Sequence, residues 1–286
     1  MAFNLQTFKT RTLTAIIFVV VMLVGLLFNQ WSFLILFSVI HFGCWIEYQK
    51  LVGLIDKDYQ QVSSMHRNII MLIGWCFILF MSNHVLKLGN IALKGIGWYG
   101  IMVLTIIFCL VEILLKKNLN IKTIAYSAFG LVYISLSWGL LIGLRFLYPG
   151  FLVDYGLLYV LFLIASIWIN DTMQYIVGSL IGKTPFSKVS PKKTWEGTIG
   201  GSILCVAVIA LTAYFGFKCK GVIAIGIPLI AAVMGTLGDL FESKLKRMAN
   251  VKDSGQFMPG HGGFLDRFDS LLLASPFVWL LIKLFA

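Results

Sequence analysis

Charged residues are concentrated between positions 239 and 269 of a chain that is otherwise strongly apolar. The aspartates of this segment could supply the oxygen ligands that a hard metal ion prefers: Asp239, Asp253, Asp266 and Asp269. Its basic residues could neutralise phosphate oxygens: Lys244, Lys246, Arg247, Lys252 and Arg267. Because charge beside a membrane is costly unless it has a function, the segment predicts a site for phosphate-bearing molecules at a membrane face.

A glycine-rich loop at residues 259–263 lies inside this segment. Gly260, Gly262 and Gly263 would let the backbone approach a ligand closely. A lone histidine is usually a hydrogen-bonded structural residue, but His261 is flanked by glycines. We therefore expect His261 to contact phosphate or to organise the loop, rather than to act as a general base.

Asp239, Glu242 and Lys246 have the spacing i, i+3 and i+7, which places them on one face of a helix. An acid in an apolar helix costs about 2.5–3.5 kcal/mol at the membrane centre and less near the interface. A structural ion pair with one of the basic residues that follow would explain Asp239. We favour the alternative that Asp239 binds a metal ion together with Asp266 or Asp269.

A second polar segment lies upstream, between residues 168 and 197. Pro191 stiffens its loop, and Lys192 and Lys193 concentrate positive charge at the start of a helix, where anions bind readily. The alternative is that the two lysines have no function beyond topology and only reflect the excess of Lys and Arg on cytoplasmic loops. That alternative does not explain Asp171, which follows Asn170 at the end of an apolar stretch, so we favour a functional role.

Residues 243–269 read Ser-x-Leu-Lys-Arg-x4-Lys-Asp-x-Gly-x2-Met-Pro-Gly-His-Gly-Gly-x2-Asp-Arg-Phe-Asp. This pattern resembles the signature of the phosphatidate cytidylyltransferases, also called CDP-diacylglycerol synthases. Residues 190–197 and the pair Asn170-Asp171 are similar to the upstream motif of that family. The motifs cover roughly residues 165–272, while residues 1–160 resemble the family only in hydropathy. Gln174 stands where a small residue is expected, and Ser179 where an arginine is common.

The resemblance implies that CTP and phosphatidate react to give CDP-diacylglycerol and pyrophosphate, with Mg²⁺ as cofactor. It implies a metal site formed by three catalytic carboxylates: Asp239, Asp266 and Asp269. It implies that Lys252 and Arg267 also serve catalysis. The substrate contacts that it implies come from basic, glycine and acidic positions: Asp171, Lys192, Lys193, Arg247, His261, Gly262 and Gly263. A phosphate monoester is already an anionic nucleophile at neutral pH, so no general base is required.

Two other functions remain as alternatives. A CTP-dependent polyisoprenol or phytol kinase would transfer the γ-phosphate to an alcohol and would not need the full C-terminal signature. A secondary transporter would place its charges near the membrane midplane, often within inverted repeats. No repeat is visible in this chain and its charge is concentrated toward one face, so both alternatives rank below cytidylyl transfer.

The elements that must position these residues are membrane helices. The chain has 286 residues, of which 59% are hydrophobic and 12% charged, and its mean hydropathy is +0.91. Because soluble domains carry about 25% charged residues, we expect an all-α integral membrane protein. About nine apolar stretches approach the ~20 residues of a spanning helix: 13–28, 31–48, 69–86, 97–115, 121–147, 153–169, 198–216, 221–242 and 270–285.

Most lysines and arginines fall on loops of one side, which predicts a cytoplasmic N-terminus and an active site that faces the cytoplasm. This excess explains much of the net charge of +11, so we expect no nucleic-acid partner. We expect residues 1–165 to form a scaffold and residues 166–286 to carry the site, within one integral domain. The expected location is the bacterial inner membrane, with membrane lipid as a partner and a homodimer as one assembly that the chain could form.

Overall fold

The computed structural model of the chain describes residues 5–114, 120–147, 154–187, 189–257 and 262–286. These residues are almost entirely helical, and their one sheet is a hairpin of two short strands. The predicted all-α class is therefore confirmed. The chain divides into two compact units, one of residues 1–142 and 248–267 and the other of residues 143–247 and 268–286. The predicted division at residue 165 separates a scaffold from the part that carries the site, not two compact units, and it stays a prediction.

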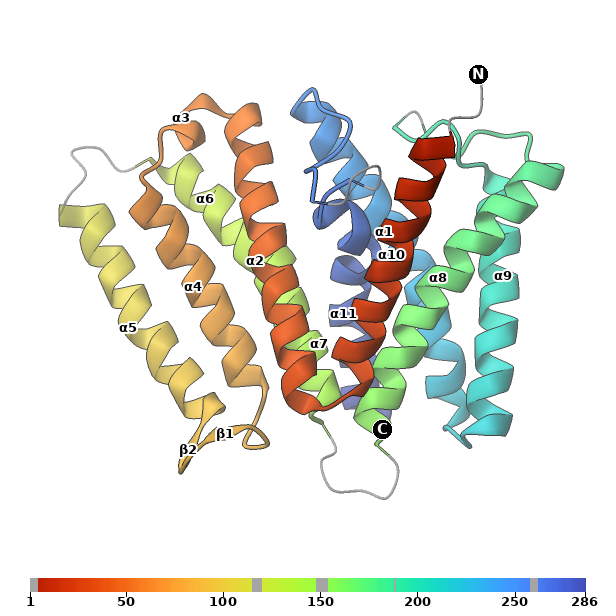
Figure 1. Cartoon of the computed structure of the whole chain (residues 1–286), viewed down its shortest axis with the longest axis horizontal. Coiled ribbons are helices and arrows are strands. Elements are labelled where there is room, and N and C mark those ends of the chain that lie inside the picture. Colours follow the sequence, from red (N-terminus) through yellow and green to blue (C-terminus); the bar gives the residue numbers. More distant parts are fainter. Residues whose placement is uncertain (1–4, 115–119, 148–153, 188, 258–261) are drawn as a thin grey trace. The chain divides into compact units, whose positions relative to one another are not determined.

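The first unit begins with a series of helices joined by short, capped turns. Its elements in chain order are α1 (Leu5–Leu27), α2 (Gln30–Ile55), α3 (Lys57–Gln60), α4 (Ser64–Met81), β1 (Lys87–Leu88), β2 (Ile91–Ala92), α5 (Leu93–Leu114), α6 (Ile121–Gly130), the π-helical turn η1 (Leu131–Leu136) and the start of α7 (Ser137–Arg145). The turn between α1 and α2 holds because the Ser32 N–H donates to Asn29 Oδ1 (2.7 Å), which satisfies one otherwise free helix donor. The β1–β2 hairpin connects α4 to α5, and these two helices run side by side (Figure 1).

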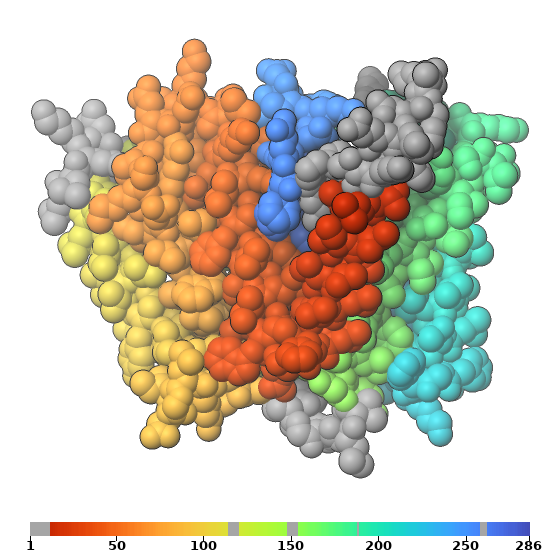
Figure 2. Space-filling view, viewed as in Figure 1, coloured from red at the N-terminus to blue at the C-terminus, as the bar shows by residue number. Residues whose placement is uncertain are grey.

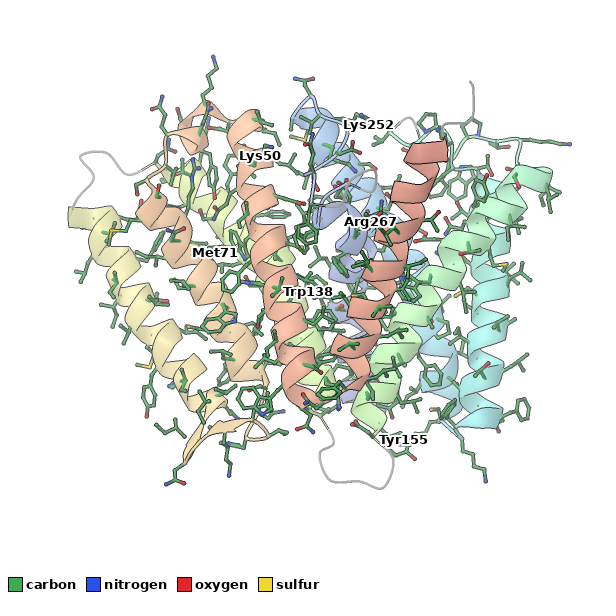
Figure 3. The ribbon with its side chains drawn as sticks, viewed as in Figure 1. Lys50, Met71, Trp138, Tyr155, Lys252 and Arg267 are labelled. Atoms are coloured by element: carbon green, nitrogen blue, oxygen red, sulfur yellow. The ribbon has the colours of Figure 1, made fainter. Side chains whose placement is uncertain are left out.

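The core of the first unit is aromatic. Phe33, Phe37, Trp45 and Trp138 are completely buried, and the rings of Phe37 and Trp138 lie 5.2 Å apart. Trp138 is labelled in Figure 3. Large aromatic side chains bury much apolar area each, so this cluster fixes α2 against α7. The outer faces are apolar as well. The surface of α1 that is visible in Figure 2 includes Leu13 to Leu27, where many side chains are about half exposed, as expected for contact with lipid.

The second unit contains the two longest helices, α8 (Tyr155–Ile181) and α10 (Gly221–Met248) up to Arg247. Its other elements are α9 (Trp195–Leu211) with its π-helical continuation η2 (Thr212–Gly216), and α11 (Leu265–Phe285) from Phe268 onward. Helices α8 and α9 pack along each other (Figure 1). Asp154 caps α8 by accepting the Leu157 N–H (3.0 Å), and its carboxylate also pairs with Arg145 (2.8 Å).

Eight helical segments of the described chain are long and apolar enough to cross a membrane. The remaining predicted stretch, 13–28, corresponds to the apolar part of α1, Thr12–Leu27, which is shorter. Several helices extend past the predicted ends of the apolar runs, so α8 continues to Ile181 and α10 to Met248. Hydropathy falls at the first polar residues, whereas backbone hydrogen bonding continues through them. As a result, Asp171 and Asp239 lie within helices rather than at their ends.

Candidate active site

Asp239 and Lys193 form an ion pair in the second unit. The Oδ2 atom of Asp239, on the last turns of α10, contacts Nζ of Lys193, which precedes α9. Both side chains are partly exposed, 29% for Asp239 and 23% for Lys193. The pair is therefore reachable from solvent, and a phosphate or a cation could compete for either partner. The sequence also allowed an ion pair between Asp239 and a basic residue that follows it, but the partner observed, Lys193, lies on the loop before α9.

The loop before α9 is folded so that Lys193 points toward α10. The carboxylate of Glu196 accepts the backbone N–H groups of Lys183 and Thr184, each at 3.1 Å. The Phe186 N–H donates to the carbonyl of Lys193 (2.8 Å), which closes the loop on itself. Glu196 and these backbone bonds therefore hold Lys183, Thr184, Phe186 and Lys193 in place on the two sides of the loop.

Two more carboxylates lie close to Asp239. Asp171 on α8 is exposed, whereas Asp269 on α11 is only 8% exposed and accepts the Ser270 N–H (2.6 Å). Both carboxylates interact electrostatically with Asp239, and Asp171 also interacts with Lys193. Gly238 makes this approach possible, because a Cβ atom there would lie 2.5 Å from the Asp269 carbonyl oxygen. The structure thus brings Asp171, Lys193, Asp239 and Asp269 together, while their predicted roles at the site stay predictions.

Glu242 and Lys246 lie on the predicted helix face but pair with each other. Lys246 Nζ is 2.5 Å from Glu242 Oε2, and the Glu242 side chain is fully buried. A buried carboxylate needs such a partner, because an unpaired charge in an apolar interior is strongly unfavourable. Lys246 therefore neutralises Glu242. The alternative in which a basic residue after Asp239 pairs with it is not observed, because Asp239 pairs with Lys193.

Gln174 connects α8 to the helix that carries Asp239. Its Nε2 donates to Thr236 Oγ1 (2.8 Å), three residues before Asp239, and the side chain is 7% exposed. Gly201 on α9 leaves room for it, because a Cβ atom there would lie 2.7 Å from Gln174 Cγ. The sequence marked Gln174 only as a departure from the family pattern. Its role in fixing α10 could not be seen without knowing which helices are neighbours.

The remaining predicted residues belong to the first unit or lie outside the described residues. Asp266 Oδ2 accepts the N–H groups of Ser254 (2.9 Å) and Gly263 (2.7 Å). Lys252 and Arg267, also in this unit, are exposed (Figure 3). His261 lies outside the described residues. Because Asp266 and Asp239 belong to different units, their predicted sharing of one metal ion stays a prediction.

In the second unit, Lys192 and Arg247 are both exposed. Their predicted contacts with substrate therefore stay predictions that exposure permits.

Gly262, in the first unit, has a φ of +84°, a conformation that favours glycine. The backbone conformation therefore explains why this residue is a glycine, whether or not it contacts a substrate.

One functional candidate was missed altogether. Glu47 lies on α2, within the part of the chain that the sequence indicated as scaffold, yet its carboxylate accepts hydrogen bonds from Ser254, Phe264 and Leu265. The available signal was an acidic residue within an apolar helix, the same signal that identified Asp239.

The acidic residues of the second unit fit Mg²⁺. Within the described ranges, no group of three or more His, Cys, Asp or Glu side chains is close enough to hold a metal ion. Mg²⁺, however, is commonly bound by one or two carboxylates, with substrate phosphates and water completing its octahedral shell. Asp239 and Asp269 supply two interacting carboxylates, one of them partly exposed, so the donor set suits a metal ion that arrives with a nucleotide.

The chain matches the cytidylyltransferase family over residues 9–285. It is 30% identical over 283 residues to a phosphatidate cytidylyltransferase of Bacillus subtilis (strain 168), covering 98% of each chain. It is 32% identical over 276 residues to the protein of the same name from Staphylococcus saprophyticus, covering 96% of this chain and 98% of the relative. The chain therefore belongs to the cytidylyltransferase family, as the resemblance of its motifs predicted.

Proposed function

We propose that this chain is an integral membrane enzyme that transfers the cytidylyl group of CTP to phosphatidate, giving CDP-diacylglycerol and pyrophosphate. The family match and the names of the relatives support this reaction over a lipid kinase or a transporter. The structural observation that carries the proposal is the cluster of Lys193 with the carboxylates of Asp171, Asp239 and Asp269, which come from three helices. Such a cluster can bind a polyphosphate and a cation together.

The reaction needs charge neutralisation more than proton transfer. An oxygen of the phosphatidate phosphate attacks the α-phosphorus of CTP, the bond from that phosphorus to the oxygen bridging the β-phosphate breaks, and pyrophosphate leaves. Two polyanions must approach each other, so positive groups must offset their repulsion. Lys193 is placed to do so, and the exposed Lys192 and Arg247 are proposed to contact further phosphate oxygens.

Mg²⁺, when bound, would supply positive charge to the phosphates of the nucleotide. Asp239 and Asp269 would hold it, and we propose Asp266 as the third ligand, as the signature implies. The Lys193–Asp239 pair has a second role, because the lysine orients the Asp239 carboxylate before substrate enters. The proposed roles of Lys252, Arg267, His261, Gly262 and Gly263 in holding substrate rest on the signature alone.

We also propose the bacterial inner membrane as the location, with the site open to the cytoplasm, where CTP is available. The distribution of loop lysines and arginines supports this orientation. A homodimer remains a proposal of the same kind. Single cysteines placed at Lys192, on the loop before α9, and at Lys94, in the first turn of α5, would test the orientation through their labelling by a membrane-impermeant reagent. Labelling of the Lys192 position in intact cells would contradict it.

The purified chain in lipid nanodiscs, supplied with CTP, phosphatidate and Mg²⁺, tests the reaction. CTP labelled at the α-phosphate should transfer its label to lipid, while pyrophosphate is released in equal amount. CTP labelled at the γ-phosphate should leave the lipid unlabelled. Transfer of γ-label to a lipid alcohol, with CDP as the other product, would replace the proposal by a kinase.

A further inference from the structure

Glu47 makes three hydrogen bonds to the signature segment within the first unit. Its Oε1 accepts the N–H of Phe264 (2.8 Å), and its Oε2 accepts the N–H of Leu265 (2.9 Å) and the hydroxyl of Ser254 (2.6 Å). The residue is 7% exposed and lies on α2, beside the loop that follows α10 (Figure 1). A buried carboxylate is stable only when such donors replace water, and backbone N–H groups at a helix start are especially good donors to an anion.

Ser254 joins Glu47 to Asp266. The Ser254 hydroxyl oxygen lies 2.6 Å from Glu47 Oε2 and 2.9 Å from Asp266 Oδ2, and the Ser254 N–H donates to the same Asp266 oxygen. The two carboxylates thus bind consecutive parts of one loop. Glu47 fixes the start of α11 at Phe264 and Leu265, and Asp266 reaches back to the Gly263 N–H (2.7 Å). Any movement of Glu47 would therefore move the residues that orient Asp266.

At two positions of the signature, Gly255 and Gly263, Glu47 leaves no room for a side chain. A Cβ atom at Gly255 would lie 2.2 Å from Glu47 Oε1, and one at Gly263 would lie 2.3 Å from the same oxygen. Real Cβ atoms do not approach other atoms so closely, so any side chain at either position would displace the carboxylate or the loop. The loop is therefore built around Glu47.

We propose that Glu47 is a positioning residue for the reaction: it holds the signature loop against α2 so that Asp266 points correctly. This inference rests on the proposed function, in which Asp266 binds the metal ion. Glu47 itself touches neither substrate nor metal in this account. Its removal leaves buried N–H groups of Phe264 and Leu265 without an acceptor and frees the loop. Displacement of a reacting group by about 1 Å can lower the rate about a hundredfold.

Two measurements on Glu47→Gln in nanodiscs test this role, with Glu112→Gln as the matched control. Glu112 is also a buried acid of the first unit, but it bonds to His66 on α4 (2.6 Å). Hydrogen exchange should quicken in peptides that cover residues 250–257 and 262–267 of Glu47→Gln, and kcat should fall about tenfold to a hundredfold. In Glu112→Gln both quantities should remain those of the unsubstituted chain. Unchanged exchange in Glu47→Gln, or faster exchange with unchanged kcat, would overturn the proposal.

If Glu47→Gln does not fold, Ser254→Ala can be measured instead, because the serine substitution removes only the bridging hydroxyl. It should quicken exchange in the same peptides and lower kcat by a smaller factor, and unchanged values would count against the bridge. In the double variant the two effects on kcat should not add, since both act through one network. If the unsubstituted chain forms no CDP-lipid, the proposed function fails, and the exchange data alone decide whether Glu47 holds the loop.

Discussion

Asp239 in the second unit is satisfied by a different kind of partner from Glu47 and Asp266 in the first. In the second unit, Asp239 pairs with the side chain of Lys193, and both groups are partly exposed. In the first unit, Glu47 and Asp266 are bound mainly by the backbone N–H groups of Ser254, Gly263, Phe264 and Leu265. A lysine on a flexible stem can release its carboxylate to a cation or turn to a phosphate, whereas backbone donors cannot leave without refolding the loop. The comparison indicates an adaptable group of charges in one unit and a rigid support in the other.

Asp266→Asn should have the largest effect, because it acts on both the chemistry and the support. An amide nitrogen in place of Oδ2 would face the N–H groups of Ser254 and Gly263, so rotation or loss of these bonds is unavoidable. We expect turnover to be abolished and stability to fall by about 1–3 kcal/mol, while the chain still inserts into the membrane. Thermal unfolding and CTP turnover would be measured beside Asp58→Asn, an exposed aspartate of α3. Turnover near that of the unsubstituted chain would remove Asp266 from the metal site.

Asp239→Asn should lose comparable activity but little stability, which separates the two kinds of carboxylate. Its partner Lys193 is partly exposed and can be hydrated when the pair is broken, so the folded state loses little. We expect kcat to fall about 10²- to 10³-fold. Asp154→Asn is the control, since Asp154 also pairs with a basic residue, Arg145, but at the opposite end of α8 from Asp171. A stability loss as large as that of Asp266→Asn would contradict the comparison.

Much of the second unit's site could be predicted from sequence because its acidic residues stand out: their position in or beside apolar helices is energetically unfavourable. Asp171, Asp239 and Asp269 stand in or beside apolar helices, where an acid is unfavourable without a function. Family motifs then assigned them to one reaction. The all-α class followed in the same way from continuous apolar runs.

The support of the first unit could not be predicted, since it depends on pairings between distant positions. Glu47 and Ser254 are separated by 207 residues, and the sequence around either residue does not indicate that the other is its hydrogen-bond partner. The same holds for Gln174 and Thr236, which are 62 residues apart. Hydropathy locates helices but does not say which of them are neighbours, so residues that orient a site are harder to recognise than residues that form it.

Lys193→Ala should have a smaller effect than the aspartate substitutions, and it tests which of the two adjacent lysines belongs to the cluster. Lys193 contacts Asp239, whereas Lys192 is exposed on the same loop. We expect kcat/KM for CTP to fall about tenfold to a hundredfold in Lys193→Ala and less in Lys192→Ala, because only Lys193 is held by the cluster. Steady-state kinetics with both substrates varied would measure this. Equal losses would mean that the fixed position of Lys193 gives it no advantage.

Gln174→Ala should have the smallest effect, because it removes one neutral hydrogen bond from the second unit and no charge. The bond to Thr236 steadies α10 just before Asp239, but the Oε1 atom of Gln174 is buried and has no hydrogen-bond partner within the described part of the chain. Removal of that unsatisfied oxygen offsets part of the loss. A net loss of about 1 kcal/mol corresponds to about fivefold in rate, so we expect kcat to fall by less than about tenfold. A hundredfold loss in the CTP assay, with unchanged thermal stability, would instead place Gln174 among the groups that act on the substrate, and the second unit would then need rigid support as much as the first.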